Sequence, residues 1–209
     1  VLTERQLELR DLGALPESEM WRWMRDEGKP IGDVVAGRTN HQPDLKEAWA
    51  AANLVGKSSD KFVEHLDSRS VAVRYWAIMG LRQADSANPK ILPRVAEHLK
   101  DTAPAVRIET AAWLAHWDEY HERSLAVLRA DLEHNDWWIA LRACRAIELL
   151  GERAARLKGA MRKVHDRTRP NTQSDATLFL AFSSSAFLKA LGEEVESWDF
   201  SPEAKGRKP

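Results

Sequence analysis

The chain of 209 residues has a single cysteine, Cys144, so neither an internal disulfide framework nor a cysteine-based zinc site can form within it. No apolar run approaches the roughly 20 residues that a membrane helix needs, and we therefore expect no membrane partner. The formal net charge is −1, which excludes a strong global field for nucleic acid or anionic lipid. At this length the chain can bury a core, either as one domain or as one run of repeats.

Recognisable catalytic patterns are also missing. Ser183–Ser185 lack the Gly-X-Ser-X-Gly turn that exposes a serine nucleophile. His116 and His121 are five residues apart, whereas a helical zinc pair is four apart. Cys144 falls on the apolar side of its predicted helix, where a thiol is inert. We expect no enzymatic activity in this chain, and no metal or cofactor.

A segment of ten residues occurs twice. His65–Arg74 is echoed by His98–Arg107 at an offset of 33 residues, and a weaker third copy follows another 33 residues on, around Leu132. A fixed period of this length is typical of stacked helical repeats.

Each copy predicts a pair of helices. The second helix of each pair carries a β-branched, a small and a large aliphatic residue at the helical spacing of four. These inward triples are Val73/Ala77/Leu81, Val106/Thr110/Leu114 and Ile139/Ala143/Ile147. The pattern predicts an all-α fold, an α-solenoid of antiparallel helix pairs with helical caps.

The chain divides into three predicted parts. Residues 1–44 form a partly helical connector or cap, and residues 192–209 form a polar, flexible tail. Residues 45–191 hold the repeats, near 45–83, 89–117, 121–150 and 151–191.

Three more helices are predicted from proline, glycine and apolar residues. Pro89 is predicted to open the first helix of the second repeat, and another helix is predicted after Gly151. A last helix over 175–191 is predicted to cover the end of the stack, with its inward side made by Leu178, Phe179, Phe182, Phe187, Leu188 and Leu191.

The repeat resembles HEAT-like repeats. The resemblance is carried by aspartate in the turn between paired helices and Val-Arg at the start of the second helix, as in Asp101 with Val106-Arg107. Asp67 with Val73-Arg74 is similar, whereas the third copy departs with Ile139-Ala140. In this position Arg74 and Arg107 either bind the turn aspartate and nearby carbonyls, forming a ladder along the stack, or contact a ligand.

A narrower resemblance covers most of the chain. Arg10–Glu19, Val73–Ala77 and Val106–Ile108 are similar to the C-terminal extension of certain bacterial sulfatases. The resemblance implies a longer parent enzyme, in keeping with Val1 as first residue, and a periplasmic or extracellular location. It carries over no catalytic residue, because Cys144 is followed by Arg145-Ala146-Ile147-Glu148 where that family has a Cys/Ser-X-Pro-X-Arg motif.

The candidate interaction surface lies where the copies disagree. Trp76, Glu109 and Arg142 share one repeat position on the side of the helix away from the triples. Of the adjacent Trp137 and Trp138, one must face away from the core, because neighbours on a helix do not share a face. The full set is Trp76, Glu109, Arg142, Arg145, Trp138, Arg156, Lys163 and Arg167.

Two kinds of partner fit this surface. The first is protein, either the parent's own catalytic domain or another chain, held by a non-catalytic scaffold. The second is a polyanion, nucleic acid or a sulfated glycan, because residues 151–169 hold seven Lys or Arg against two acids. HEAT-like DNA glycosylases use Trp and Arg in this way, although the net charge near zero and the acidic residues 1–44 favour a protein partner.

Overall fold

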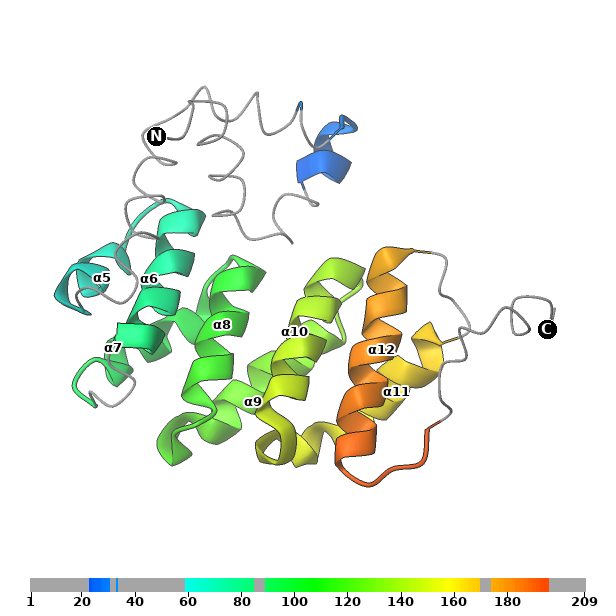
Figure 1. Cartoon of the computed structure of the whole chain (residues 1–209). Coiled ribbons are helices and arrows are strands. Elements are labelled where there is room, and N and C mark those ends of the chain that lie inside the picture. The colour runs from blue at the N-terminus through cyan, green and yellow to red at the C-terminus, as the bar shows by residue number, and fades with distance from the viewer. Residues whose placement is uncertain (1–22, 31–32, 34–58, 85–88, 170–173, 196–209) are drawn as a thin grey trace, which may run out of the picture.

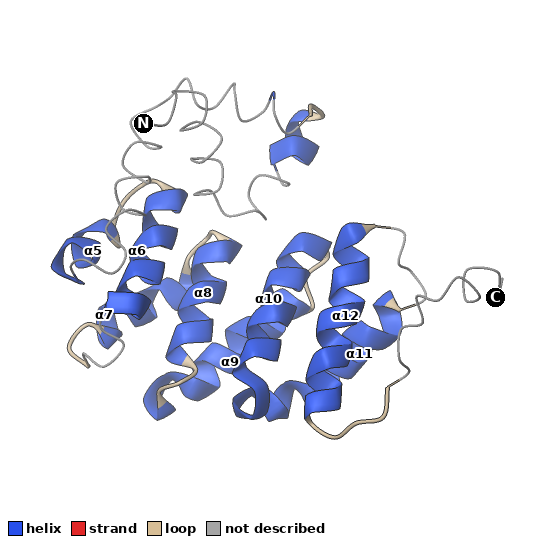
Figure 2. Ribbon diagram, in the orientation of Figure 1, coloured by secondary structure: helices blue, strands red, loops and turns tan. Residues whose placement is uncertain are grey.

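The computed structural model describes residues 23–30, 33, 59–84, 89–169 and 174–195. Within these ranges every regular element is a helix and there is no strand (Figure 2), so the all-α prediction is confirmed for this part of the chain. None of the described helices is long and apolar enough to cross a membrane.

The helices are arranged in two layers (Figure 1). The elements are α5 (Ser59–His65), α6 (Val71–Ala84), α7 (Leu92–Glu97), η1 (His98–Lys100), α8 (Pro104–Leu114), α9 (Asp118–Leu132), α10 (Trp137–Leu150), η2 (Gly151–Leu157), α11 (Lys158–Thr168) and α12 (Asp175–Ala190). Helices α6, α8, α10 and α12 follow one another in one layer, and neighbours in this order pack against each other. Behind them α9 packs on α8 and α10, and α11 packs on α12.

The predicted inward triples form the core between the layers. All of their side chains are buried, from Val73, Ala77 and Leu81 on α6 to Ile139, Ala143 and Ile147 on α10. The one polar member, Thr110, donates its hydroxyl to the Val106 carbonyl at 2.8 Å, so its burial leaves no unsatisfied group. A small residue in the middle of each triple lets neighbouring helices approach closely.

Two predicted helix starts need correction. The first helix of the second repeat begins at Leu92, not Pro89, and the proline in its first turn is Pro93, where the missing N–H has no helical partner to lose. After Gly151 the chain forms the 3₁₀ helix η2 before α11. Three residues per turn place Ala154 and Leu157 on the same side, and both are buried.

The prediction that Phe179 lies on the inward side of the last helix is wrong. Its side chain is 50% exposed, and the core side of α12 is made instead by smaller residues and Phe187. Ser184 and Ser185 are buried there because each donates its hydroxyl to a carbonyl one turn earlier, at 2.7 Å. Short side chains bring α12 close to α10, and the bulky Phe179 is left on the outer side.

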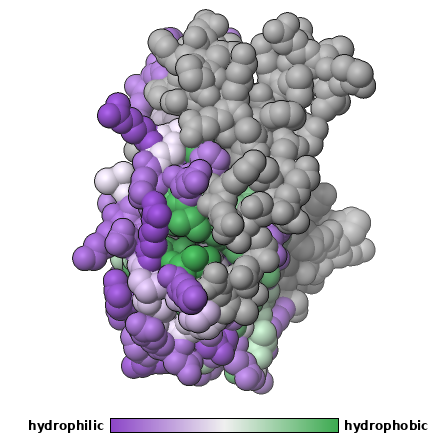
Figure 3. Space-filling view, turned by 90° about the vertical axis from the view of Figure 1, so that its left-hand side faces the viewer, coloured by the Kyte–Doolittle hydropathy of each residue, from purple (hydrophilic) through white to green (hydrophobic). Residues whose placement is uncertain are grey.

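Several predictions fall outside the described residues. These are most of the connector over 1–44, the first part of the repeat near 45–83 up to residue 58, and the tail after residue 195. Residues 23–27 are helical, and Trp23 and Met24 are half-buried. Figure 3 shows apolar side chains between hydrophilic ones at the end that carries α5 to α7.

Candidate docking groove

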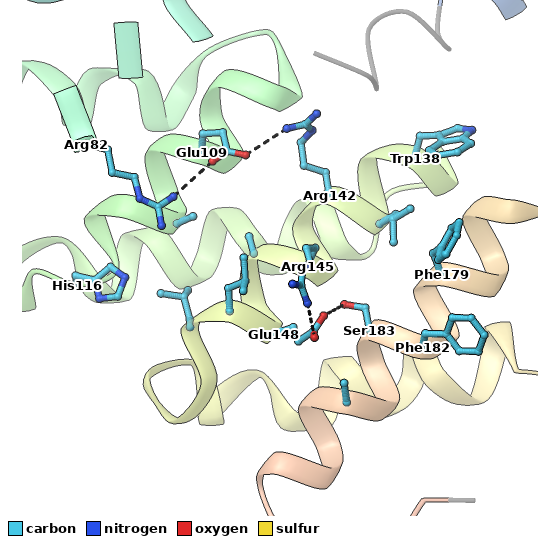
Figure 4. A pocket seen from close by; sticks show the side chains of 16 residues that line it. Arg82, Glu109, His116, Trp138, Arg142, Arg145, Glu148, Phe179, Phe182 and Ser183 are labelled. Atoms are coloured by element: carbon cyan, nitrogen blue, oxygen red, sulfur yellow. Dashed lines mark hydrogen bonds and ion pairs between the residues drawn. The ribbon is translucent and has the colours of Figure 1, made fainter. Parts of the chain in front are cut away.

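A groove of about 570 Å³ opens on the layer formed by α6, α8, α10 and α12 (Figure 4). Its volume is within the range of sites that bury a small ligand or a few side chains of a partner. Apolar and charged side chains both line it: Arg82, Glu109, Ala112, His116, Trp138, Leu141, Arg142, Arg145, Ala146, Glu148, Leu149, Leu150, Phe179, Phe182, Ser183 and Ala186.

Aromatic rings gather at one end of the groove. Trp138 of α10 lies near Phe179 and Phe182 of α12 (Figure 4). The two phenylalanine rings meet edge to face, with centroids 6.2 Å apart. Phe179 at 50% and Leu149 at 66% are the exposed large hydrophobic side chains of the described chain, and both line this groove. Exposed apolar side chains concentrated in one concavity indicate a binding surface.

Charged side chains occupy the rest of the groove in two clusters. Glu109 accepts a hydrogen bond from Arg142 Nη1 at 3.2 Å, and its other oxygen lies 3.7 Å from Arg82 Nη1. Glu148 forms an ion pair with Arg145 and accepts the Ser183 hydroxyl at 2.6 Å. Arg142 also lies over the Tyr75 ring, 5.6 Å from its centroid.

Two of the three arginines lie nearer to solvent than the acids they bind, whereas Arg142 is as buried as Glu109. The Arg145 side chain is 56% exposed and that of Arg82 is 38% exposed, whereas Glu109 and Glu148 are each 18% exposed. Partial burial lowers the pKa of His116, as do the neighbouring charges of Arg153 and Arg82, so this imidazole is neutral near pH 7. Three arginines against two glutamates leave the groove with a net charge of +1.

The structure brings together half of the sequence-predicted interaction residues. Glu109, Arg142, Arg145 and Trp138 all line the groove. Trp76 does not, because its ring packs against Ala72 and Val73 on its own helix and edge-on to Tyr75. The other three, Arg156, Lys163 and Arg167, lie on η2 and α11.

Sequence reasoning missed several groove residues, although the repeat contained a signal for some. Glu109 and Ala112 on α8, with His116 in the turn after it, recur 33 residues later as Arg142, Arg145 and Leu149 on α10. Positions i, i+3 and i+7 share a helix face, so extending the shared position along the helix would have found His116 and Leu149. Phe179, Phe182 and Ser183 have no such signal, because α12 is not a copy of the repeat.

The two repeated arginines serve the stack and not the groove. Arg74 binds both oxygens of Asp101, through Nε at 2.7 Å and Nη2 at 2.9 Å, and donates Nη1 to the Ser68 carbonyl at 2.8 Å. Each of these pairings joins residues of successive repeats or of one inter-helix turn, as a ladder requires. The ladder interpretation is therefore confirmed for Arg74.

Arg107 repeats this arrangement with a different acid. It binds both oxygens of Asp131, with Nε at 2.8 Å, and donates Nη1 to the Thr102 carbonyl at 3.0 Å. Asp131 takes the repeat position of His98, since the third copy exchanges the histidine and the aspartate of the second. The acid has moved by one turn, and the guanidinium still reaches it.

Hydrogen bonds determine the ionisation of the turn aspartate. Burial alone would raise the pKa of Asp101, but hydrogen bonds from His98, Arg74 and the Ala103 amide outweigh it. Together they hold the pKa of this carboxyl well below its usual range, so Asp101 is ionised at neutral pH.

Acids from α9 and from the segment after α12 pair with most of the basic run. Arg156 pairs with Glu122, and Arg153 lies near Asp118 and donates to the His116 carbonyl at 3.0 Å. Lys158 and Arg162 share Glu193, at 2.8 and 2.7 Å. The Arg167 guanidinium lies 4.5 Å from the centroid of the Trp137 ring. A polyanion would have to displace these partners, which weakens the case for a basic patch.

Cys144 is fully buried and faces Met161 at 3.7 Å. Burial raises the pKa of its thiol to about 12, which disfavours the reactive thiolate, and the predicted position on the apolar side of the helix is confirmed. In the part of the chain that the structure describes, no three His, Cys, Asp or Glu side chains are placed to hold a metal ion.

Comparison with known proteins supports the repeat assignment. Residues 59–148 match the family model described as HEAT repeats, and this range runs from α5 almost to the end of α10. No curated protein and no solved structure matches the chain. The match supports a HEAT-like repeat protein, a kind of protein that commonly mediates protein interactions and is generally non-catalytic.

Proposed function

We propose that the chain is a non-catalytic scaffold, an α-solenoid that holds a protein partner in the groove on α8, α10 and α12. The observation that carries the proposal is that Leu149 and Phe179, the exposed large hydrophobics of the described residues, line the same groove. Separate chance exposure of two such side chains would not place them in one concavity.

Repeat positions that are the same in successive copies and positions that differ between copies make different contacts, which also supports a docking role. Positions that recur unchanged, such as Arg74 and Arg107, make the ladder that joins successive repeats. Positions that differ between copies, such as Glu109 and Arg142, face the groove. Keeping the ladder residues the same preserves the packing of successive repeats, and changing the groove residues alters which partner can bind.

Two finer parts of the proposal rest on the sequence. One is the division of the chain into a connector over 1–44, repeats over 45–191 and a tail over 192–209. The other is a parent chain of the sulfatase type, which rests on the resemblance given above. Sequence upstream of Val1 that contains a Cys/Ser-X-Pro-X-Arg motif would support this parent. The chain itself should not hydrolyse an aryl sulfate, and turnover would contradict the scaffold.

The polyanion alternative has a simple test. Because ion pairs already occupy most of the basic run, we expect the protein to leave a heparin column at low salt. Strong retention that falls steeply between two salt concentrations would favour the polyanion over a protein partner.

Co-purification with matched variants tests the scaffold. The tagged chain is recovered from its source cells beside Leu149→Asp, in the groove, and Ala126→Asp, at an exposed position on α9. Both side chains are exposed, so both variants should melt like the wild type. We expect the same partner with wild type and Ala126→Asp and its loss with Leu149→Asp. Retention by Leu149→Asp would show that docking occurs elsewhere.

A further inference from the structure

The groove on α8, α10 and α12 has two chemically different ends. Trp138, Phe179 and Phe182 form an aromatic end, and Arg82, Glu109 and Arg142 form a charged end (Figure 4). The Arg145–Glu148–Ser183 cluster lies between them. A ligand that fills the groove must therefore present an apolar group and a charged group close together.

The exposed fractions of the charged groove side chains indicate the sign of the ligand's charged group. Arg145 and Arg82 are the most exposed members of the two clusters, and the glutamates lie below them. Each glutamate already has two partners: Glu109 has two arginines, and Glu148 has Arg145 and the Ser183 hydroxyl. An incoming cation would find few open acceptors, whereas a guanidinium has five N–H donors and can serve a second carboxylate.

From these observations we infer that the groove binds an acidic peptide segment of a protein partner, with large apolar side chains at the aromatic end and a carboxylate on Arg145 and Arg82. The inference rests on the proposed function and specifies its partner. An isolated polyanion lacks the apolar part, and the net charge of +1 is too small to hold one by charge alone. A peptide with both groups satisfies the two ends at once.

Selection from a phage-displayed library of random 12-residue peptides tests the inference without a known partner. We expect the enriched peptides to combine Asp or Glu with Phe, Trp or Leu. Synthetic copies should bind Arg145→Glu and Leu149→Asp at least about tenfold more weakly than wild type. Binding to Arg156→Glu, on the other layer, should be unchanged. Higher salt should weaken binding to the wild type and have less effect on Arg145→Glu.

Other outcomes separate this inference from the proposed function. Groove-dependent peptides that are neutral or basic would overturn the acidic partner and leave the scaffold standing. No groove-dependent peptide would overturn the inference, and co-purification would then decide the scaffold independently.

Two rival occupants belong to the chain itself. One is the acidic, aromatic segment with Glu196, Trp198, Asp199 and Phe200. If removing residues 196–209 raised peptide affinity about tenfold or more, this segment would be the occupant, and the external partner would be wrong. A dimer in sedimentation that Leu149→Asp dissolves would make a second copy the occupant, with the same consequence.

Discussion

The ion pair between Arg107 and Asp131 joins successive repeats and is largely enclosed. Their side chains are 21% and 3% exposed, and the guanidinium contacts both carboxylate oxygens and two carbonyls. A buried pair of this kind is costly to break, because the remaining carboxylate stays buried without its partner.

Replacement of Arg107 by alanine should therefore lower the free energy of unfolding by about 2–4 kcal/mol. Arg129→Ala is the matched control, since its pair with Glu133 is exposed on one helix and should change stability by less than about 0.5 kcal/mol. Urea unfolding of both variants measures the difference. If Arg107→Ala were as stable as Arg129→Ala and only bound partners less well, the arginine would be a ligand contact instead of part of the ladder.

Asp101 makes the stability of the protein depend on pH. Since its pKa is depressed in the folded state, its contribution is complete above about pH 5 and is lost as the pH falls below about 4. The gap in unfolding free energy between wild type and Asp101→Asn should therefore be large at pH 6 and shrink toward pH 3. Asp67→Asn, at a carboxyl 68% exposed, should show almost no gap. A gap that stays constant with pH would contradict the assigned ionisation.

At the scale of the helix, close approach is set by small residues at a few positions. Gly80 on α6 is one, because a Cβ there would overlap the ring of Phe62 on α5, which is fully buried. Gly159 on α11 has nothing within 4 Å of the same position. The two glycines form a matched pair in which only one is required by packing.

Gly80→Ala should destabilise the protein by about 1–3 kcal/mol, since forcing apart α5 and α6 outweighs the better helix propensity of alanine. Gly159→Ala should be neutral or stabilising by up to about 1 kcal/mol. Thermal melting of the two variants gives the comparison. A stable Gly80→Ala protein would mean that α5 does not pack on α6 as described.

For the whole molecule, the parts that follow the repeat could be predicted and the parts outside it could not. The inward triples and the ladder arginines repeat at 33 residues, so comparing copies identified them. Glu109 and Arg142 were predicted because the copies differ there, Trp138 because adjacent tryptophans cannot share a helix face, and Arg145 as an addition to the basic run.

The sequence alone did not predict the orientation of α12 or the ion pairs of the basic run. Its orientation is set by contact with α10 and α11, not by its own pattern, so Phe179 was placed inward although it is exposed. The pairing of Arg156 with Glu122 and of Lys158 with Glu193 likewise depends on distances between helices. The sequence therefore did not show which residues of the basic run have acidic partners.

Photo-crosslinking tests most directly whether the groove is the docking surface. A photo-crosslinking amino acid at position 149, in the groove, is compared in source cells with the same residue at position 126, on the exposed side of α9. We predict an adduct with one defined protein at position 149 and none at position 126, and the attachment point on the partner should lie in an acidic segment. Adducts at position 126 with none at position 149 would contradict the account.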